Sequence, residues 1–360
     1  MSSVATVEID CSALRHNLVR VRESAPGTQV IAVIKANAYG HGLVRVAKVL
    51  QQAGSEAFAV ARVNEAIQLR EAGIQQPIIC LEGFLNSAEL HELARHDVQV
   101  VVHHANHVAL LEQQRLDEPV SVWFKIDSGM HRLGVSPQRA MEIWQRLTAC
   151  NSVKAVRLMT HLASADDPQS EQTQQQLELF ASTTKGMVAE TSIANSAGIL
   201  GWPQSHGDWV RPGLMLYGAS PFINGRGESA GLQPVMTFSS HLIAVNHFKR
   251  GDPIGYGASW RCPEDMAVGV VACGYGDGYP RHAKMGTPVL ISGQRLPLVG
   301  RVSMDTLCVD LRAAPMVNIG DAVTLWGKGL PVEEVAECAA TIPYELLCAV
   351  AGRVAVEVVN

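Results

Sequence analysis

The feature that most constrains this chain is a repeated alternation of short β-branched runs and amphipathic stretches between residues 30 and 212. In the amphipathic stretches, apolar side chains recur at the i, i+3, i+4, i+7 spacing of a helix with one buried face, as in Leu43, Val46, Ala47 and Leu50. Counting gives about eight strand–helix units in roughly 190 residues. That number favours an α/β fold of the closed (β/α)8 TIM-barrel type over an open doubly wound sheet.

The expected elements of this barrel alternate in order along the chain. The expected strands are Val30–Lys35, Ala57–Val60, Ile78–Leu81, Val98–Val102, Val120–Ile126, Ala155–Thr160, Thr191–Ala194 and Trp209–Pro212. The expected helices are Leu43–Gln52, Asn64–Ala72, Ser87–Arg95, His107–Gln114, Pro137–Ala149 and Gln172–Lys185.

A second, mainly β domain is expected over residues 233–360, where helical periodicity fades and glycine and valine dominate. Its expected strands are Val235–Phe248, Ala267–Ala272, Val289–Ser292 and Ala322–Trp326, with short helices near Val332–Ala340 and Pro343–Ala349. The Gly-rich segment Ile223–Gly231 is the expected boundary loop. The barrel domain then spans residues 1–232, and residues 1–10, with an expected strand at Ala5–Ile9, are candidates for pairing with the C-terminal domain.

Composition argues against several classes of protein. The net charge is −5 and no run of Lys or Arg stands out, which argues against nucleic-acid binding. Apolar runs are too short for a membrane span, and the first ten residues lack the apolar core of a signal peptide. The eight cysteines form no C-x-x-C pair, which argues against a metal site. We therefore expect a cytoplasmic protein without a metal.

Polar side chains gather at the ends of the expected barrel strands. They are Lys35, Lys125, His161, Asn195, Ser196 and Arg211. The carboxyl ends of barrel strands form one mouth, where enzymes of this fold place their sites. By contrast, His103, His104 and His107 have no carboxylate or thiol partner at ligand spacing, and we expect them at the surface.

Lys35 stands in the segment AVIKANAYGHG (32–42), which resembles the pyridoxal-phosphate attachment motif of alanine racemases. Further segments resemble the same family in the same order. They are FKIDSGMHRLG (124–134), MTHLASAD (159–166), ANSAG (194–198), DWVRPGLMLYG (208–218), GYGASW (255–260), CGYGDGYPR (273–281), GRVSMD (300–305) and PYEL (343–346). The resemblance covers nearly the whole chain and implies an isomerase that interconverts L- and D-alanine.

The resemblance implies that pyridoxal 5'-phosphate is attached to Lys35 and that two bases act on opposite faces of the substrate. Lys35 would handle the proton of the D-enantiomer and Tyr256 that of the L-enantiomer. Tyrosine is a weak acid, so Tyr256 needs cationic or hydrogen-bonding neighbours, for which His161 and Arg211 are the family's candidates. Arg211 would also face the ring nitrogen of the cofactor, and because arginine can only donate, it would keep that nitrogen unprotonated.

The resemblance also implies binding roles for other residues. The expected cofactor contacts are Tyr39, His161, Asn195, Ser196, Arg211, Gly213, Leu214 and Tyr344. Ser196 could equally cap the helix that follows it. Arg132 would meet the substrate carboxylate, and Lys125 matches a lysine that many members carbamylate, which would turn a buried cation into an anion beside Arg132.

A homodimer with composite active sites is the last implication. In the family, Tyr256, Tyr275, Met304 and Asp305 of one subunit reach the barrel of the partner, and Tyr275 with Met304 and Asp305 narrows the pocket to the size of alanine.

Related possibilities are a broad-specificity racemase, a decarboxylase of the same fold, and a cofactor-binding homeostasis protein that has no second domain. The last is disfavoured by the C-terminal residues, which include Tyr256. Whether the enzyme supplies D-alanine for peptidoglycan or serves alanine breakdown stays open.

Overall fold

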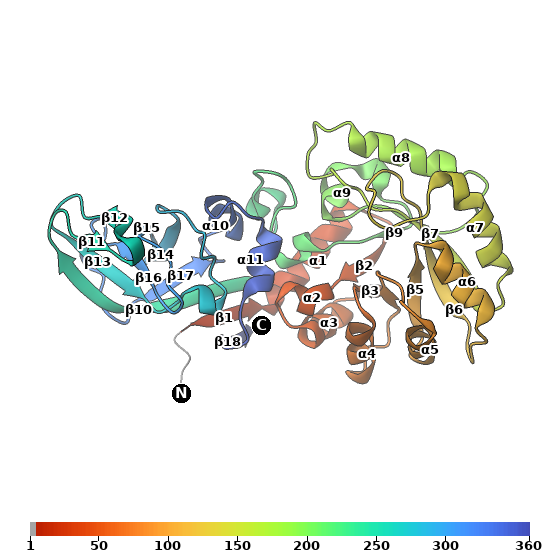
Figure 1. Ribbon diagram of the computed structural model, residues 1–360, viewed down its shortest axis with the longest axis horizontal. Coiled ribbons are helices and arrows are strands. Elements are labelled where there is room, and N and C mark those ends of the chain that lie inside the picture. Colours follow the sequence, from red (N-terminus) through yellow and green to blue (C-terminus); the bar gives the residue numbers. More distant parts are fainter. Residues whose placement is uncertain (1–4) are drawn as a thin grey trace. The chain divides into compact units, whose positions relative to one another are not determined.

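The computed structural model describes residues 5–360, and their contacts divide the chain into two compact units (Figure 1). The N-terminal unit comprises Arg15–Leu216 and Pro221–Ile223. The C-terminal unit comprises Tyr217–Ser220, Asn224–Asn360 and the N-terminal residues up to Leu14. Among the residues described, no helix is both long enough and apolar enough to span a membrane.

The N-terminal unit is a closed barrel of parallel strands, which confirms the fold class predicted from the alternating pattern. The strands, in barrel order, are β2 (Gln29–Val33), β3 (Ala57–Val60), β4 (Ile78–Cys80), β5 (Val98–Val102), β6 (Val120–Lys125), β7 (Val153–Met159), β8 (Thr191–Ser192) and β9 (Trp209–Val210). Most of their side chains are buried on both faces, as strands enclosed by helices require. Phe58, Trp123 and Phe124 are among the largest buried side chains.

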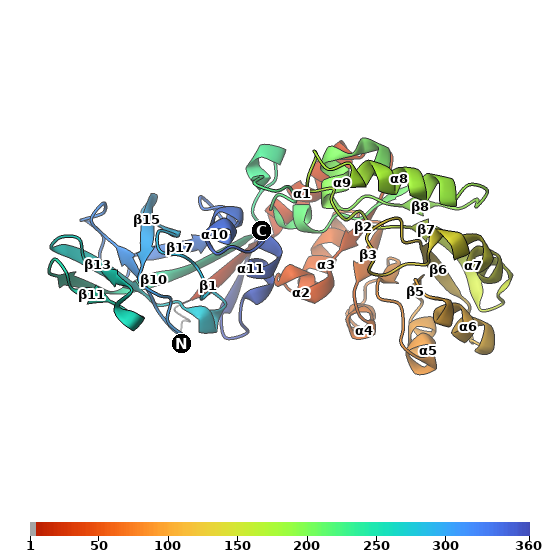
Figure 2. The same cartoon turned by 45° about the horizontal axis from the view of Figure 1, so that its top comes forward.

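Helices lie outside these strands (Figures 1 and 2). They are α1 (Cys11–Ser24), which begins in the C-terminal unit, α2 (Lys35–Tyr39), α3 (Leu43–Gln52), α4 (Val63–Glu71), α5 (Ser87–Arg95), α6 (Ala105–Gln113), α7 (Pro137–Ala149), α8 (Gln172–Thr183) and α9 (Ser196–Gly201). Three of them, α3, α5 and α7, have the boundaries that the sequence predicts. Helix α1 was not expected, although Leu14, Leu18 and Val21 form a buried stripe along it.

The C-terminal unit is built on an eight-stranded sheet with the order β13-β16-β15-β14-β17-β10-β1-β18 and a further pairing of β13 with β10. The strands are β1 (Thr6–Asp10), β10 (Met236–Phe248), β13 (Met266–Val271), β14 (Pro288–Ile291), β15 (Gln294–Val299), β16 (Leu307–Asp310), β17 (Ala322–Trp326) and β18 (Ala355–Val359). A small hairpin, β11 (Pro253–Ile254) and β12 (Trp260–Arg261), completes the unit with the helices α10 (Val332–Cys338) and α11 (Pro343–Ala349).

The N-terminal strand β1 belongs to this second sheet. It pairs antiparallel with β10 and parallel with β18, with Thr6 opposite both Ser239 and Ala355. Residues 1–4 lie outside the described residues. In the same sheet, Trp326 of β17 packs against Phe238 of β10, with ring centroids 4.7 Å apart, and against Tyr279, at 6.1 Å.

A buried carboxylate, Glu333, fixes the segment that follows the barrel. It lies in the first turn of α10, and its Oε1 accepts hydrogen bonds from the backbone N–H groups of Ser220 (2.8 Å) and Gly227 (2.9 Å). The neighbouring Glu334 instead forms an ion pair with Arg295, whose side chain is largely exposed. Glu333 therefore binds two backbone N–H groups, whereas the adjacent Glu334 binds an exposed side chain.

We expect Glu333→Ala to destabilise the C-terminal unit by about 2–4 kcal/mol, because two buried N–H groups lose their acceptor. The matched variant Glu334→Ala should cost about 0–1 kcal/mol, as exposed ion pairs do. Urea unfolding followed by tryptophan fluorescence measures both free energies. Equal losses in the two variants would contradict the anchoring role of Glu333.

Candidate active site at the mouth of the barrel

Lys35 lies directly after the first barrel strand. The N–H groups of Val33 and Ile34 donate to Pro212 O and Ala59 O, both at 2.9 Å, so the chain is held by neighbouring strand ends up to the residue before Lys35. The strand β2 therefore ends at Val33, two residues earlier than predicted, and Lys35 begins a short helical turn. Its side chain is partly buried, as the end of an apolar strand predicts.

Arg211 is fixed from several sides at the end of β9. Its Nη1 donates to Ser192 Oγ (2.7 Å), and its Nη2 donates to Thr160 O (2.6 Å) and Ile193 O (3.1 Å). The side chain is 4% exposed, and burial lowers the pKa of Arg211 to about 10, so the group is still protonated at neutral pH. A buried guanidinium held in this way can only donate hydrogen bonds.

His161 lies beside this guanidinium, with its Nδ1 3.3 Å from Arg211 Nη2. Because arginine donates, Nδ1 must accept, which assigns the ring proton to Nε2. Burial is the largest cause that holds the pKa of His161 well below its usual range. The cations Arg211, Lys125, Arg132 and Lys35 lower this pKa further. The imidazole is therefore neutral at physiological pH.

Lys125 ends β6 within the same set of charges. Burial, and then the neighbouring cations Arg211, Arg132 and Lys35, lower the pKa of Lys125 to about 8. The carboxylate of Asp127 opposes this shift, but it also accepts from the N–H groups of Gly129 and His131, both at 3.0 Å. Positive charge thus exceeds negative charge around Lys125, and this excess favours the binding of an anion.

Ser196, Gly213 and Tyr39 meet at another part of the mouth. Ser196 Oγ accepts hydrogen bonds from the N–H groups of Gly213 (2.9 Å) and Met215 (3.3 Å), which leaves its own proton available to a ligand. A Cβ at Gly213 would lie 2.5 Å from Tyr39 Oη, so only glycine lets the phenol approach this closely. Leu214 follows Gly213 and begins a 3-10 turn. Hydroxyl donors at this part of the mouth suit a phosphate.

Asn195, rather than Ser196, caps the helix that follows β8. Its Oδ1 accepts from Gly198 N–H (3.0 Å) and its Nδ2 donates to Leu162 O (3.4 Å). The side chain of Asn195 is therefore engaged within the protein. Its expected cofactor contact stays a prediction.

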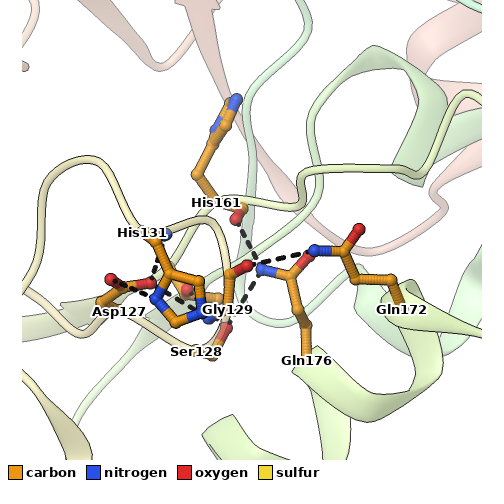
Figure 3. A network of polar contacts seen from close by, with 8 residues as sticks. Asp127, Ser128, Gly129, His131, His161, Gln172 and Gln176 are labelled. Carbon is orange, nitrogen blue, oxygen red and sulfur yellow. Dashed lines mark hydrogen bonds and ion pairs between the residues drawn. The ribbon is translucent and has the colours of Figure 1, made fainter.

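Two glutamines of α8 hold the loops after β6 and β7 (Figure 3). Gln172 bonds to the loop that carries Arg132, and Gln176 bonds to the loop that carries His161. Gln176 Nε2 donates to His161 O (2.9 Å), and its Oε1 accepts from Ala163 N–H (2.8 Å). Gln172 Nε2, one helical turn away, donates to Gly129 O (3.1 Å). The side chain of Arg132 itself is exposed. These bonds hold the loops after β6 and β7 in register with each other.

The remaining predicted site residues lie in the C-terminal unit. Tyr275 N–H donates to Ser303 O (3.0 Å), and Arg353 Nη2 donates to Asp305 Oδ1 (2.7 Å). Tyr256 lies in a turn with positive φ at Gly255, Gly257 and Ala258, and the turn packs against Arg301. The structure thus brings the turns that carry Tyr256 and Tyr275 against the segment 301–305, which includes Met304 and Asp305. Tyr344 lies in the first turn of α11.

Several functional features escaped the sequence analysis. Gln172, Gln176 and Asp127 carried no distinguishing signal, although Asp127 lies within a segment that resembles the family. The surface assignment was wrong for His107, which is buried with its ring stacked on Phe84 at 4.6 Å between centroids. It lies on the apolar face of α6 beside Val108 and Leu111, and the helix buries that face.

Comparisons with known proteins agree with this architecture. Residues 9–221 match the family described as alanine racemase, N-terminal domain, and residues 235–358 match alanine racemase, C-terminal domain. The chain is 55% identical over 350 residues to the alanine racemase of Nitrosococcus oceani, covering 96% of this chain and 97% of that one. It is 49% identical over 358 residues to the biosynthetic alanine racemase of Escherichia coli, covering 99% of each.

Solved structures give the same result. The biosynthetic alanine racemase of Pseudomonas aeruginosa superposes with a TM-score of 0.97 at 40% identity, over 100% of both chains. The alanine racemase of Bartonella henselae, described with covalently bound pyridoxal phosphate, superposes with a TM-score of 0.91 at 28% identity, over 99% of this chain and 100% of that one. On the evidence of both domains and of full-length relatives, the chain belongs to the alanine racemase family.

Proposed function

We propose that this chain is an alanine racemase that interconverts L- and D-alanine with pyridoxal 5'-phosphate at the barrel mouth, using Lys35 and Tyr256 as its two bases. The observation that carries the proposal is the excess of cations around His161, in a chain of this family. The Bartonella henselae relative, with its covalently bound cofactor, supports the choice of cofactor. When bound, pyridoxal phosphate supplies an electron sink that weakens the Cα–H bond of the amino acid.

The donor groups of the mouth fit such an anionic cofactor. Its phosphate would lie against the hydroxyl of Ser196, the phenol of Tyr39 and the backbone at Gly213 and Leu214. Tyr344, in the first turn of α11, would add a further contact. Arg211 would donate to the ring nitrogen and keep it unprotonated, which would limit negative charge on Cα and disfavour transamination. Neutral His161 and Asn195 would adjoin the ring. The amine of Lys35 would hold the cofactor covalently.

The two bases then exchange protons with opposite faces of the substrate Cα. Lys35, freed when the amine of the substrate takes its place on the cofactor, would remove or return the proton of D-alanine, and Tyr256 would do the same for L-alanine. Arg132 binds the substrate carboxylate, since guanidinium and carboxylate form paired hydrogen bonds. Tyr275, Met304 and Asp305 restrict the pocket to a side chain of methyl size. Side activity on serine would report how strict that restriction is.

We further propose a homodimer in which each site combines residues of both chains. Tyr256 is 70% exposed and Met304 54% exposed in the single chain, which is unusual for groups that bind a small substrate away from water. A partner barrel would cover them. The eight cysteines are free thiols, in keeping with a cytoplasmic enzyme. The name biosynthetic carried by the Escherichia coli relative favours supply of D-alanine over alanine breakdown.

The test of this function is racemisation in heavy water. The holoenzyme with L-alanine should lose optical rotation while solvent deuterium enters at Cα, because the proton is removed on one face and returned on the other. Polarimetry and proton NMR measure the two rates. Exchange without loss of rotation would contradict a two-base mechanism.

A matched variant assigns the bases in the same assay. Tyr256→Phe should still exchange the Cα proton of D-alanine through Lys35, while exchange of L-alanine falls by about 10²- to 10⁴-fold, as the loss of a general base predicts. An equal loss of Cα proton exchange for both enantiomers would show that Tyr256 is not the base for L-alanine.

Carbamylation of Lys125 is a separate prediction. The neutral amine attacks carbon dioxide, forms an N–C bond and releases a proton, leaving a carbamate that can pair with Arg132 and relieve the repulsion among Lys125 and the neighbouring cations. Because the pKa of Lys125 is lowered to about 8, the neutral amine, and with it the carbamate, increases as the pH rises through that value. Carbon-13 NMR with labelled bicarbonate should show a carbamate signal that Lys125→Ala lacks. A signal of equal size in that variant, or none above pH 8, would contradict the prediction.

A further inference from the structure

Four successive residues after Lys35 have a left-handed backbone. Ala36, Asn37, Ala38 and Tyr39 have φ of 53–54°, and the ψ values of the first three are 54°, 42° and 52°. L-residues avoid this conformation because Cβ comes too close to the following carbonyl, and it occurs mostly at single residues. A run of four without a glycine persists only where the surroundings fix it.

The C-terminal end of this turn is held by its own backbone and by Asn37. Gly40 N–H donates to Ala36 O (3.1 Å), and Gly42 N–H donates to Asn37 O (2.9 Å). The side-chain oxygen of Asn37 accepts from Leu43 N–H (2.9 Å) at the start of α3. At the N-terminal end, Ala38 N–H donates to Ile34 O (2.8 Å) across Lys35, whereas the N–H of Ala36, next to Lys35, finds its acceptor outside the turn.

Glu65 holds that end. Its Oε1 accepts from Ala36 N–H at 2.7 Å, and its Oε2 accepts from the N–H groups of Ala61 (3.0 Å) and Arg62 (3.1 Å). One carboxylate in the first turn of α4 thus joins the left-handed turn to the loop after β3. All of these contacts are donations into the carboxylate, so both oxygens must be acceptors.

The turn places two groups that the proposed function uses. Lys35 precedes its first residue, and Tyr39 ends it with the phenol oxygen against Gly213, whose N–H is bonded to Ser196. A shift of the turn would therefore move the amine and the phenol together. Misplacement of reacting groups by about 1 Å can lower a rate by roughly 10²-fold.

We propose that Glu65 is a positioning residue that fixes the left-handed turn and thereby sets the places of the Lys35 amine and the Tyr39 phenol. This inference rests on the proposed function only in the role given to Lys35 and Tyr39. Glu65 acts through Ala36 and takes no part in the chemistry itself.

The test compares Glu65→Gln with Glu89→Gln. Glu89 occupies the same position in α5, and its Oε2 accepts from Leu85 N–H (2.7 Å), in the loop before its own helix rather than in the turn. Glutamine in place of Glu65 turns an NH2 group toward N–H donors. Amide hydrogen exchange in the cofactor-free protein should therefore rise by about tenfold or more over residues 35–42 in Glu65→Gln, and stay unchanged there in Glu89→Gln.

The holoenzyme supplies a second readout. We expect Glu65→Gln to raise the dissociation constant of pyridoxal phosphate by roughly tenfold and to lower kcat more than it changes the KM for alanine, as loss of a supporting contact does. If Glu65→Gln does not fold, Glu65→Asp, which keeps two acceptors but shortens the reach, should show intermediate effects.

Exchange rates and cofactor affinity equal to those of the Glu89→Gln protein would overturn the inference. Reduction of the wild-type holoenzyme with borohydride and mass mapping test the proposed function separately. Attachment at another lysine would defeat that function, while faster exchange in cofactor-free Glu65→Gln would still establish that Glu65 holds the turn.

Discussion

The concentration of positive charge at the carboxyl ends of the barrel strands is the constraint on which the rest of the site depends. Lys35, Lys125, Arg132 and Arg211 act together on one imidazole, and the pKa of Lys125 falls to about 8 through burial and its cationic neighbours. Burying unpaired charge is costly, so anions that bind at this mouth relieve that cost. The phosphate of the proposed cofactor, the carboxylate of the proposed substrate and the predicted carbamate are three such anions.

The groups around this charge are held by the protein. Arg211 is bonded to three oxygens of the barrel, and the buried Gln176 links the loops that carry His161 and Arg132. Such preorganisation means that binding does not have to order the site. The same logic extends to Lys35, which is followed by a turn that only a network of acceptors can maintain.

Much of the fold followed from periodicity, and its limits have physical causes. Parallel strands buried on both faces read as short apolar runs, so the barrel could be predicted closely. In the C-terminal unit β15 contains Pro297, which weakens a strand signal, and β16 is only Leu307–Asp310 between turns. Ala36 and Ala38 give no sign of a left-handed turn, because glycine and, less strongly, asparagine are the residues that favour this conformation, and here it is imposed by tertiary contacts such as that of Glu65.

The site residues divide in the same way. Polar residues at strand ends, together with the resemblance to the family, identified the cations and Ser196, whereas Gln172 and Gln176 read as ordinary positions of a polar helix. Their function depends on which loops α8 covers, and that is a property of the packed barrel. The roles of Tyr256, Tyr275, Met304, Asp305 and Tyr344 stay predictions of the resemblance.

The proposed mechanism requires that an amine from one chain and a phenol from its partner act on the same carbon. Subunit complementation tests it most directly: Lys35→Ala and Tyr256→Phe chains with different tags are co-expressed, and the mixed dimer is isolated. Each parent dimer lacks one base in both sites, but a mixed dimer with sites shared between chains regains one intact site. One restored site out of two should give the mixed dimer about half of the wild-type racemase activity. A mixed dimer as inactive as its parents would contradict the proposed mechanism.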